Sequence, residues 1–404
     1  MRKNHLGVKI FFIIIIAIIS ASIFILVRKI ENIPDETYVF DLNEFKPKND
    51  FPISMKIRDN VTEVSMICNE KCKKYKVDIK VFGIKYKSVN VNVLPRVKVI
   101  PSGEEIGVYL KTKGVLVIDT GFVADETGKK VSPSEGIIKP DDYIVSLNGI
   151  EVGTKSQLIF LINKYGENDI NLGIKRKDKL INVKITPVKT AENKYQLGIW
   201  IRDDSQGIGT LTYVTEDGQF GALGHGISDV DTGKLLESED GILYMANVWG
   251  IRKGSNGEPG GVLGSINYED TNILGTITDN TSLGIFGKLN IEKLENAKSS
   301  NPIDIKLKKE IKTGKAYIRS SVSGKVIDYE IEITKIHPNT KSKTKSMEIK
   351  ITDKELLDLT NGILRGMSGS PILQDGKMVG AVTHVFVNEP TKGYAIFIEN
   401  MLEH

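Results

Sequence analysis

The chain has 404 residues, of which 40% are hydrophobic and 26% charged, so it is long enough for two or three domains with buried cores. Its formal net charge of +4 is small for this length, and we expect no affinity for nucleic acid. The two cysteines, Cys68 and Cys72, exclude a disulfide framework and a four-cysteine zinc site. They leave one local disulfide or two thiols as alternatives.

The N-terminal residues contain a long apolar run. Residues 10–27 are apolar apart from two serines, and three basic residues precede them. This run is longer than the apolar region of a secretory signal and nearly spans the hydrocarbon core of a bilayer. We therefore expect residues 1–30 to form a cytoplasmic tail and an uncleaved transmembrane signal anchor, with the rest of the chain outside the cytoplasm. A cleaved signal peptide is the alternative, with its site near the small residues 20–22.

Residues 31–100 are predicted to form a linker and a small β-rich module. In "VDIKVFGIKYKSVNVNVLP" (77–95), apolar residues alternate with lysine and asparagine. Such alternation is typical of half-buried antiparallel strands. Nothing in this stretch indicates chemistry.

Residues 101–188 carry a more specific pattern. "EEIGVYLKTKGVLVID" reads as two strands, "GIIKPDDYIVSLNGIEV" as a turn and a strand ending in a tight turn, and "TKSQLIFLINKYG" as a capped amphipathic helix. This order resembles the PDZ domains of bacterial extracytoplasmic proteases. The resemblance implies that Glu105, Ile106, Gly107 and Val108 form a loop whose backbone amides bind a peptide carboxylate. The peptide would then add as an extra strand beside the helix.

From residue 195 to residue 404, glycines separate many short β-type runs, such as "GIGTLTYVTEDGQFGALGHGI". Turns every 8–12 residues favour a barrel or a sandwich. One helix is predicted late in this region, at "TDKELLDLTNG" (352–362). The fold class is therefore mainly β, with this helix and the amphipathic helix of the PDZ-like region as exceptions outside the N-terminus.

The stretch "LRGMSGSPI" (364–372) raises the question of why two serines lie among glycines. It resembles the G-x-S-G-x-P signature of chymotrypsin-like serine proteases, and "ILQDGKMVGAVTH" continues the similarity. The resemblance implies a double β-barrel peptidase domain in which Ser368 is the nucleophile. The backbone amides of Gly366 and Ser368 would then form the oxyanion hole. There is neither a phosphate-binding G-x-x-x-x-G-K-[ST] motif nor an H-E-x-x-H helix, and we expect no cofactor and no metal.

Three of the five histidines lie away from the chain ends and are candidates for the general base. His225, in "GALGHGIS", is predicted to take the proton of Ser368. Its alternative is a histidine bonded to backbone in a glycine-rich loop. His384 is predicted to shape the cleft or the core, and His337 to be exposed.

The acid of a catalytic triad is harder to identify. Asp353 lies in the predicted first helical turn of "TDKELL", where a favourable charge near a helix N-terminus explains it without a catalytic role. Other candidates are Asp358, Asp229, Asp231, Asp270 and Asp279.

Together, the PDZ-like region, "GALGHGISD", "ITDKELL" and "RGMSGSPILQDGKMVGAVTHVFVN" resemble the stage IV sporulation protein B (SpoIVB) family of serine peptidases. The resemblance implies the triad His225, Asp353 and Ser368, although Asp353 lies much closer to the serine than the acid does in chymotrypsin. It also implies secretion from the forespore into the space between two membranes. There the enzyme would cleave a regulator of an intramembrane metalloprotease, so that a mother-cell sigma factor is activated.

A catalytically silent PDZ adaptor that binds peptide tails is the competing hypothesis. For the ligand of the PDZ groove, an outside peptide and a segment of the chain itself are the alternatives. The joint presence of His225 and Ser368 in glycine-rich loops favours the peptidase, because an adaptor needs neither residue.

Overall fold

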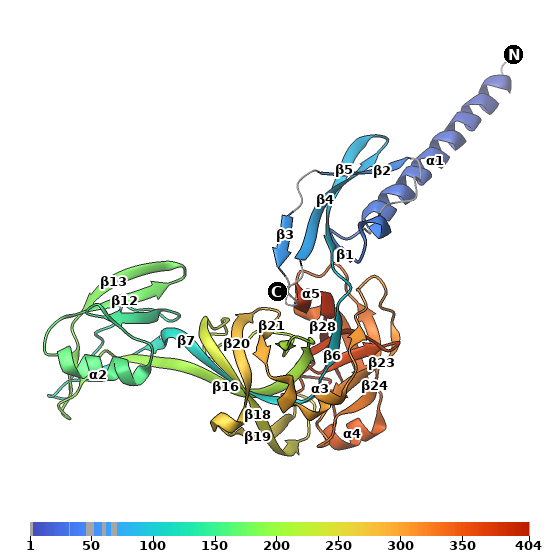
Figure 1. The fold of residues 1–404 in the computed structure, drawn as a ribbon. Helices are drawn as coiled ribbons and strands as arrows, with labels where there is room; N and C mark the ends of the chain where they lie inside the picture. The colour runs from blue at the N-terminus through green and yellow to red at the C-terminus, as the bar shows by residue number, and fades with distance from the viewer. Residues whose placement is uncertain (1–2, 32, 46–51, 59–61, 66–70, 404) are drawn as a thin grey trace. The chain divides into compact units, whose positions relative to one another are not determined.

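The computed structural model describes residues 3–31, 33–45, 52–58, 62–65 and 71–403 (Figure 1). The chain divides into two compact units: Met1–Val97 with Pro338–Lys341, and Lys98–His337 with Ser342–His404. Cys68 lies outside the described residues, whereas Cys72 is buried.

The first unit contains a helix and a five-stranded sheet. The helix is α1 (Lys3–Glu31), and the strands are β1 (Glu36–Val39), β2 (Ile53–Ile57), β3 (Thr62–Ser65), β4 (Lys71–Val81) and β5 (Ile84–Val93), with a 3₁₀ turn at Leu42–Phe45. The alternating residues 77–95 form the hairpin of β4 and β5, and the left-handed backbone of Phe82 and Gly83 makes its turn. Val77, Ile79 and Val89 form part of its core.

The predicted transmembrane anchor is wrong. Although α1 forms over the apolar run, none of the helices in the described ranges is both long and apolar enough to cross a membrane. The sequence argument relied on the 18-residue run 10–27, which rises about 27 Å as a helix, whereas a hydrocarbon core is about 30 Å thick.

The second unit is built around two long strands, β7 (Glu105–Thr120) and β16 (Ile199–Val214), which pair over most of their length. In Figure 1 they run from the lobe that carries α2 into the larger β-rich body. The predicted PDZ and peptidase regions therefore share the same two strands.

The PDZ-like lobe surrounds the C-terminal half of β7. It comprises β8 (Val123–Ala124), β9 (Lys130–Val131), β10 (Tyr143–Leu147), β11 (Ile150–Glu151), α2 (Lys155–Tyr165), β12 (Ile170–Arg176), β13 (Lys179–Ile185), β14 (Val188–Lys189) and β15 (Tyr195–Gln196). The predicted helix is present: the Thr154 side chain accepts a hydrogen bond from the Gln157 amide, and Leu158, Leu161 and Ile162 are buried.

The other halves of β7 and β16 belong to a ring of strands. β7 pairs with both β16 and β18, so six strands connect in the cyclic order β7–β18–β20–β21–β17–β16. The members not yet defined are β17 (Gln219–Ala222), β18 (Ser238–Arg252), β20 (Ile273–Thr281) and β21 (Gly284–Leu289). Flanking elements are β6 (Lys98–Pro101), β19 (Gly261–Ile266), α3 (Glu295–Ser299), β22 (Ile303–Asp304) and 3₁₀ turns at Asp270–Asn272 and Ile291–Lys293.

The C-terminal strands form a closed six-stranded barrel. Its order is β23–β24–β25–β28–β27–β26, with β23 (Gly314–Ser320), β24 (Ile327–Ile336), β25 (Met347–Ile351), β26 (Pro371–Gln374), β27 (Lys377–Val385) and β28 (Lys392–Phe397). A 3₁₀ turn at Lys343–Lys345 and the helices α4 (Lys354–Thr360) and α5 (Ile398–Leu402) complete it. Ile331, Ile349, Ile372 and Val379 are among the residues that fill its core. The molecule is thus mainly β.

Candidate active site

His225 follows β17 in a tight turn. Leu223 and Gly224 both have φ +69°, which turns the chain sharply away from the strand. A Cβ atom at Gly224 would lie 3.1 Å from side-chain atoms of Thr383 and Ile396, so the position also requires a close approach to the C-terminal barrel. The glycine before His225 therefore brings the histidine against the barrel that carries the candidate nucleophile.

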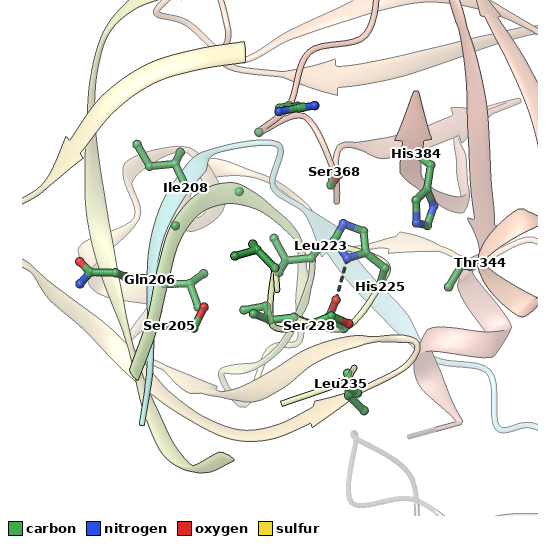
Figure 2. A pocket seen from close by; sticks show the side chains of 18 of the residues that line it. Ser205, Gln206, Ile208, Leu223, His225, Ser228, Leu235, Thr344, Ser368 and His384 are labelled. Atoms are coloured by element: carbon green, nitrogen blue, oxygen red, sulfur yellow. Dashed lines mark hydrogen bonds between the residues drawn. The ribbon is translucent and has the colours of Figure 1, made fainter. Parts of the chain in front are cut away.

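The His225 imidazole is half-buried and its tautomer is set by backbone. Nδ1 lies 2.9 Å from the carbonyl oxygen of Gly226 (Figure 2). Because a carbonyl can only accept, Nδ1 carries the hydrogen and Nε2 keeps the lone pair that a general base needs. Burial lowers the pKa of His225, while this hydrogen bond opposes the shift. The imidazole is therefore neutral at neutral pH.

The segment after His225 is fixed by Asn280 on β20. The Asn280 side chain accepts a hydrogen bond from the Ile227 amide at 2.8 Å and donates to the carbonyls of Ile227 and Leu236 at 2.9 Å. Three bonds from one amide group hold both ends of the 227–236 segment. Asn280 is thus a supporting residue that sequence reasoning missed, because Asn280 and His225 are 55 positions apart and no motif joins them.

Ser368 lies in a loop that requires glycine on both sides. Gly366 and Gly369 have φ +106° and +96°, and a Cβ at Gly369 would be 2.2 Å from the Thr210 carbonyl oxygen. Thr210 also binds the loop directly: its amide donates to the Ser368 carbonyl and its hydroxyl to the Gly366 carbonyl. The loop is thereby held against β16.

The hydroxyl of Ser368 donates a hydrogen bond to the carbonyl oxygen of Thr383 at 2.8 Å. It is therefore not engaged with His225 in this structure, and attack requires rotation about the Cα–Cβ bond of the serine. Catalytic hydrogen bonds are often absent or loose before substrate binds.

One cavity of about 760 Å³ is lined by both His225 and Ser368. Figure 2 shows the two side chains next to each other, with His384 beside them. The His225 and His384 rings have centroids 5.2 Å apart and planes inclined by 37°. Desolvation, and then the charges of His225 and Lys345, lower the pKa of His384 to about 4. The sequence-predicted base and nucleophile are thus brought together, and His384 contributes to the cleft wall.

The backbone amides of Gly366 and Ser368 are available for a ligand. Neither amide donates a hydrogen bond to any residue in the described part of the chain. Two free N–H groups beside the candidate nucleophile are what an oxyanion hole requires.

The contacts of Asp353 lie outside this site. It is the N-cap of α4, where one carboxylate oxygen accepts from the Leu356 amide at 3.0 Å and the other from the Glu330 amide at 3.3 Å. It does not line the cavity with His225, and neither do the alternative candidates, which were Asp229, Asp231, Asp270, Asp279 and Asp358. The structure therefore supports the helix-start explanation of Asp353, and the Gly226 carbonyl holds the tautomer that a triad acid would hold.

The predicted carboxylate-binding residues are also placed elsewhere. All four belong to β7: Glu105, Ile106, Gly107 and Val108 pair with β16 on one edge, and the last three also pair with β18 on the other. Ile106 and Val108 are 0% and 2% exposed in the core of the strand ring. A peptide cannot add to a strand whose two edges are already paired, so the assignment of the binding loop to these residues is wrong.

A different groove in the PDZ-like lobe has a free strand edge. A cavity of about 380 Å³ lies beside α2 and β16, lined among others by Ile159, Ile162, Leu197, Gly198 and Trp200. At residues 199–202, β16 pairs with β7 alone among the described strands. A local signal that could have found this groove is "QLGIW" (196–200), at the start of β16. Its apolar-Gly-apolar order is the same as that of residues 106–108.

Within the described ranges, no cluster of three or more histidine, cysteine or acidic side chains is arranged to hold a metal ion.

Comparison with known proteins places the chain in a family. Residues 193–402, more than half of the chain, match the family model of the SpoIVB peptidase S55. No curated protein matches. Among solved structures, the PDZ domain of an SdrC-like protein from Listeria monocytogenes is 18% identical, over 22% of this chain and 87% of that one, with a TM-score of 0.19. The HtrA-type protease AlgW with a decapeptide is 10% identical, over 75% of this chain and 63% of that one, with a TM-score of 0.30. The match between residues 193–402, which contain both His225 and Ser368, and the family model shows that this chain belongs to the SpoIVB peptidase S55 family and is a serine peptidase.

Proposed function

We propose that this peptidase acts outside the cytoplasm, in the space between the forespore and mother-cell membranes, as a sporulation signalling endopeptidase. It cleaves a regulator of an intramembrane metalloprotease and so leads to activation of a mother-cell sigma factor. Membership of the SpoIVB family supports this role. The observation that carries the endopeptidase activity is the cavity in which His225, Ser368 and the unbonded amides of Gly366 and Ser368 meet.

The chemistry follows from these groups. The Ser368 hydroxyl leaves the Thr383 carbonyl and gives its proton to Nε2 of His225 while Oγ attacks the scissile carbonyl carbon. The amides of Gly366 and Ser368 stabilise the oxyanion that forms. Protonated His225 then passes the proton to the leaving amine, and the same histidine activates the water that hydrolyses the acyl-enzyme.

The groove between α2 and β16 binds a peptide in this proposal. The free edge of β16 supplies backbone hydrogen bonds, and the exposed rings of Phe122 and Trp200 border the apolar groove. The peptide is part of the substrate or of the chain itself. A catalytically silent adaptor would need this groove alone. The meeting of His225 and Ser368 in one cavity favours an enzyme over an adaptor.

A fluorophosphonate probe tests the catalytic assignment on the purified full chain. We expect one covalent adduct, mapped by mass spectrometry to Ser368, and its loss in Ser368→Ala with the thermal unfolding temperature nearly unchanged. Ser370→Ala is the matched control and should label normally. A folded protein that does not label, or that labels at Ser370, would contradict the assignment.

A further inference from the structure

Arg365 has a fixed position immediately before one of the two oxyanion amides. Its amide donates to the Gly260 carbonyl and its carbonyl accepts from the Val262 amide, each at 2.9 Å. The next residue, Gly366, is held by the Thr210 hydroxyl. The backbone of Arg365 is therefore held as firmly as that of the oxyanion loop itself.

Arg365 lines two cavities that meet at this loop. One is the catalytic cavity of about 760 Å³, and the other has about 500 Å³ and is also lined by Val262 and Tyr268. Both cavities contain Gly366 in their walls. A polypeptide bound with its scissile bond at Ser368 has to pass through this space.

Arg365 is the only lysine or arginine among the described residues that line these cavities, and none of those residues is an aspartate or a glutamate. The exposed side chain of Arg365 makes no hydrogen bond and no ion pair with any residue in the described ranges. His225 and His384 add no positive charge at neutral pH, because burial lowers the pKa of both imidazoles. The cleft therefore presents a positive charge without a counter-charge.

We propose that Arg365 is a specificity-determining residue that selects polypeptides with an aspartate or glutamate side chain close to the scissile bond. This inference rests on the proposed endopeptidase function. A guanidinium stays protonated and offers a planar pair of donors that matches a carboxylate. A bound polypeptide also excludes water from the cleft, which strengthens the attraction.

Substrate kinetics on the full chain test the proposal. A cleaved peptide, acetylated and amidated at its ends, is varied to aspartate, asparagine or lysine at each position flanking the scissile bond. At one position or more we expect kcat/KM for aspartate to exceed that for asparagine by about 10-fold, the gain of one charge-assisted contact. A version with a free C-terminus separates recognition of a chain-terminal carboxylate from recognition of a side chain.

The variants change the charge and the geometry of the donor separately. Arg365→Gln should reduce the aspartate-to-asparagine ratio to about 1, Arg365→Glu should favour lysine, and Arg365→Lys should leave an intermediate ratio. Lys325→Gln is the control. Lys325 is exposed and lines neither cavity, and its substitution removes one positive charge, as Arg365→Gln does. Binding of the same peptides to Ser368→Ala, with and without Arg365→Gln, gives a second readout that should weaken with added salt for the acidic peptides alone.

Two outcomes would overturn the inference while leaving the peptidase intact. One is an equal ratio in the wild type and Arg365→Gln. The other is an equal loss for all peptides in Arg365→Gln, which would place Arg365 at the oxyanion and not at a substrate side chain. If no peptide is cleaved and Ser368 does not label, the proposed function fails, and the inference fails with it.

Discussion

The two serines of the loop 366–370, Ser368 and Ser370, differ in their surroundings. Ser368 is partly accessible and lines the catalytic cavity, whereas Ser370 is 0% exposed. The Ser370 hydroxyl has no hydrogen-bond partner within the described part of the chain, so it does not satisfy a buried backbone group. A buried hydroxyl without a partner costs free energy of folding.

We therefore expect Ser370→Ala to keep its activity and to be as stable as the wild type, or more stable by up to about 1 kcal/mol. Ser368→Ala should lose peptide cleavage with little change in stability. Chemical denaturation and cleavage of one peptide, measured on both variants, check this. A clear loss of stability in Ser370→Ala would show that its hydroxyl does have a partner.

We expect the lowered pKa of His225, the proposed general base, to determine the acid side of the pH profile. The ordinary histidine pKa is about 6.5, and burial makes protonation of the folded state harder. The base Nε2 should therefore remain available below pH 6.5, and kcat/KM should begin to fall only at a lower pH. A pH–rate profile on a neutral peptide measures this, and an acid limb at or above pH 6.5 would contradict it.

The same shift has a consequence for folding. Below pH 6.5 the unfolded chain binds a proton at His225 that the folded chain binds less readily, so stability falls as the pH decreases. Glu105 acts in the opposite direction. Desolvation raises the pKa of Glu105 to about 7, so between its ordinary pKa of 4.5 and 7 the folded state holds the extra proton, and stability falls as the pH increases.

Glu105→Gln should consequently stabilise the protein more at pH 8 than at pH 5. The difference between the two pH values should be about 1–3 kcal/mol, since the raised pKa makes ionisation of the folded state costly. Urea denaturation at both pH values measures it. An effect of Glu105→Gln that is independent of pH would mean that the carboxyl ionises normally in the folded protein.

At the scale of elements, α4 decides what Asp353 does. The Asp353 carboxylate caps the helix through the Leu356 amide and also binds the Glu330 amide on β24. Asn is about as good an N-cap as Asp, whereas Ala is not. The two substitutions therefore separate capping from charge.

Asp353→Asn should retain most of the turnover and lose little stability, and Asp353→Ala should lose about 0.5–2 kcal/mol with kcat changed little in the folded enzyme. A triad acid would behave differently, because Asp→Asn in a triad lowers kcat by about 10⁴. Kinetics and denaturation of both variants distinguish the two roles. A fall of that size would show that Asp353 reaches His225 in the active enzyme.

The elements also show which parts of the structure could be predicted from local sequence patterns. The loop around Ser368 was predictable, because glycines at positive φ beside a serine leave a local pattern. So were α2 and the β4–β5 hairpin, whose periodicities are local. The groove between α2 and β16 was not predictable, because residues 106–108 and 197–199 have the same apolar-Gly-apolar pattern. Only the pairing of both edges of β7 shows that the first stretch is strand interior.

At the scale of the whole second unit, the segment that follows His225 is attached to the PDZ-like lobe. Arg202, on the part of β16 that belongs to the lobe, forms ion pairs with Asp229 and Asp231. Glu237 pairs with Lys175 on β12, and its amide donates to the Tyr143 hydroxyl at 3.1 Å. His225 and the PDZ-like lobe are therefore linked through one segment, residues 227–237, and no sequence motif indicates that link.

Among the contacts of this link, the ion pair of Arg202 and Asp229 is the one whose loss we expect to reduce stability and turnover most. The Asp229 side chain is 1% exposed, and its other oxygen already accepts the amides of Asp231 and Thr232. Removal of the cation leaves a buried carboxylate without its counter-charge, which we expect to cost about 1–3 kcal/mol in Arg202→Gln. Because the disturbed segment begins two residues after His225, kcat should fall as well, with KM for a short peptide less affected.

The double variant Arg202→Gln/Asp229→Asn tests the cause. It removes the buried charge while keeping a side chain that accepts the two amides, so much of the lost stability and turnover should return. Lys184→Gln, which removes an exposed ion pair with Asp169 elsewhere in the lobe, is the control and should change neither quantity noticeably. Strictly additive effects of the two substitutions would mean that the ion pair does not hold the segment. A loss of stability without a loss of kcat would mean that the segment can move without displacing His225.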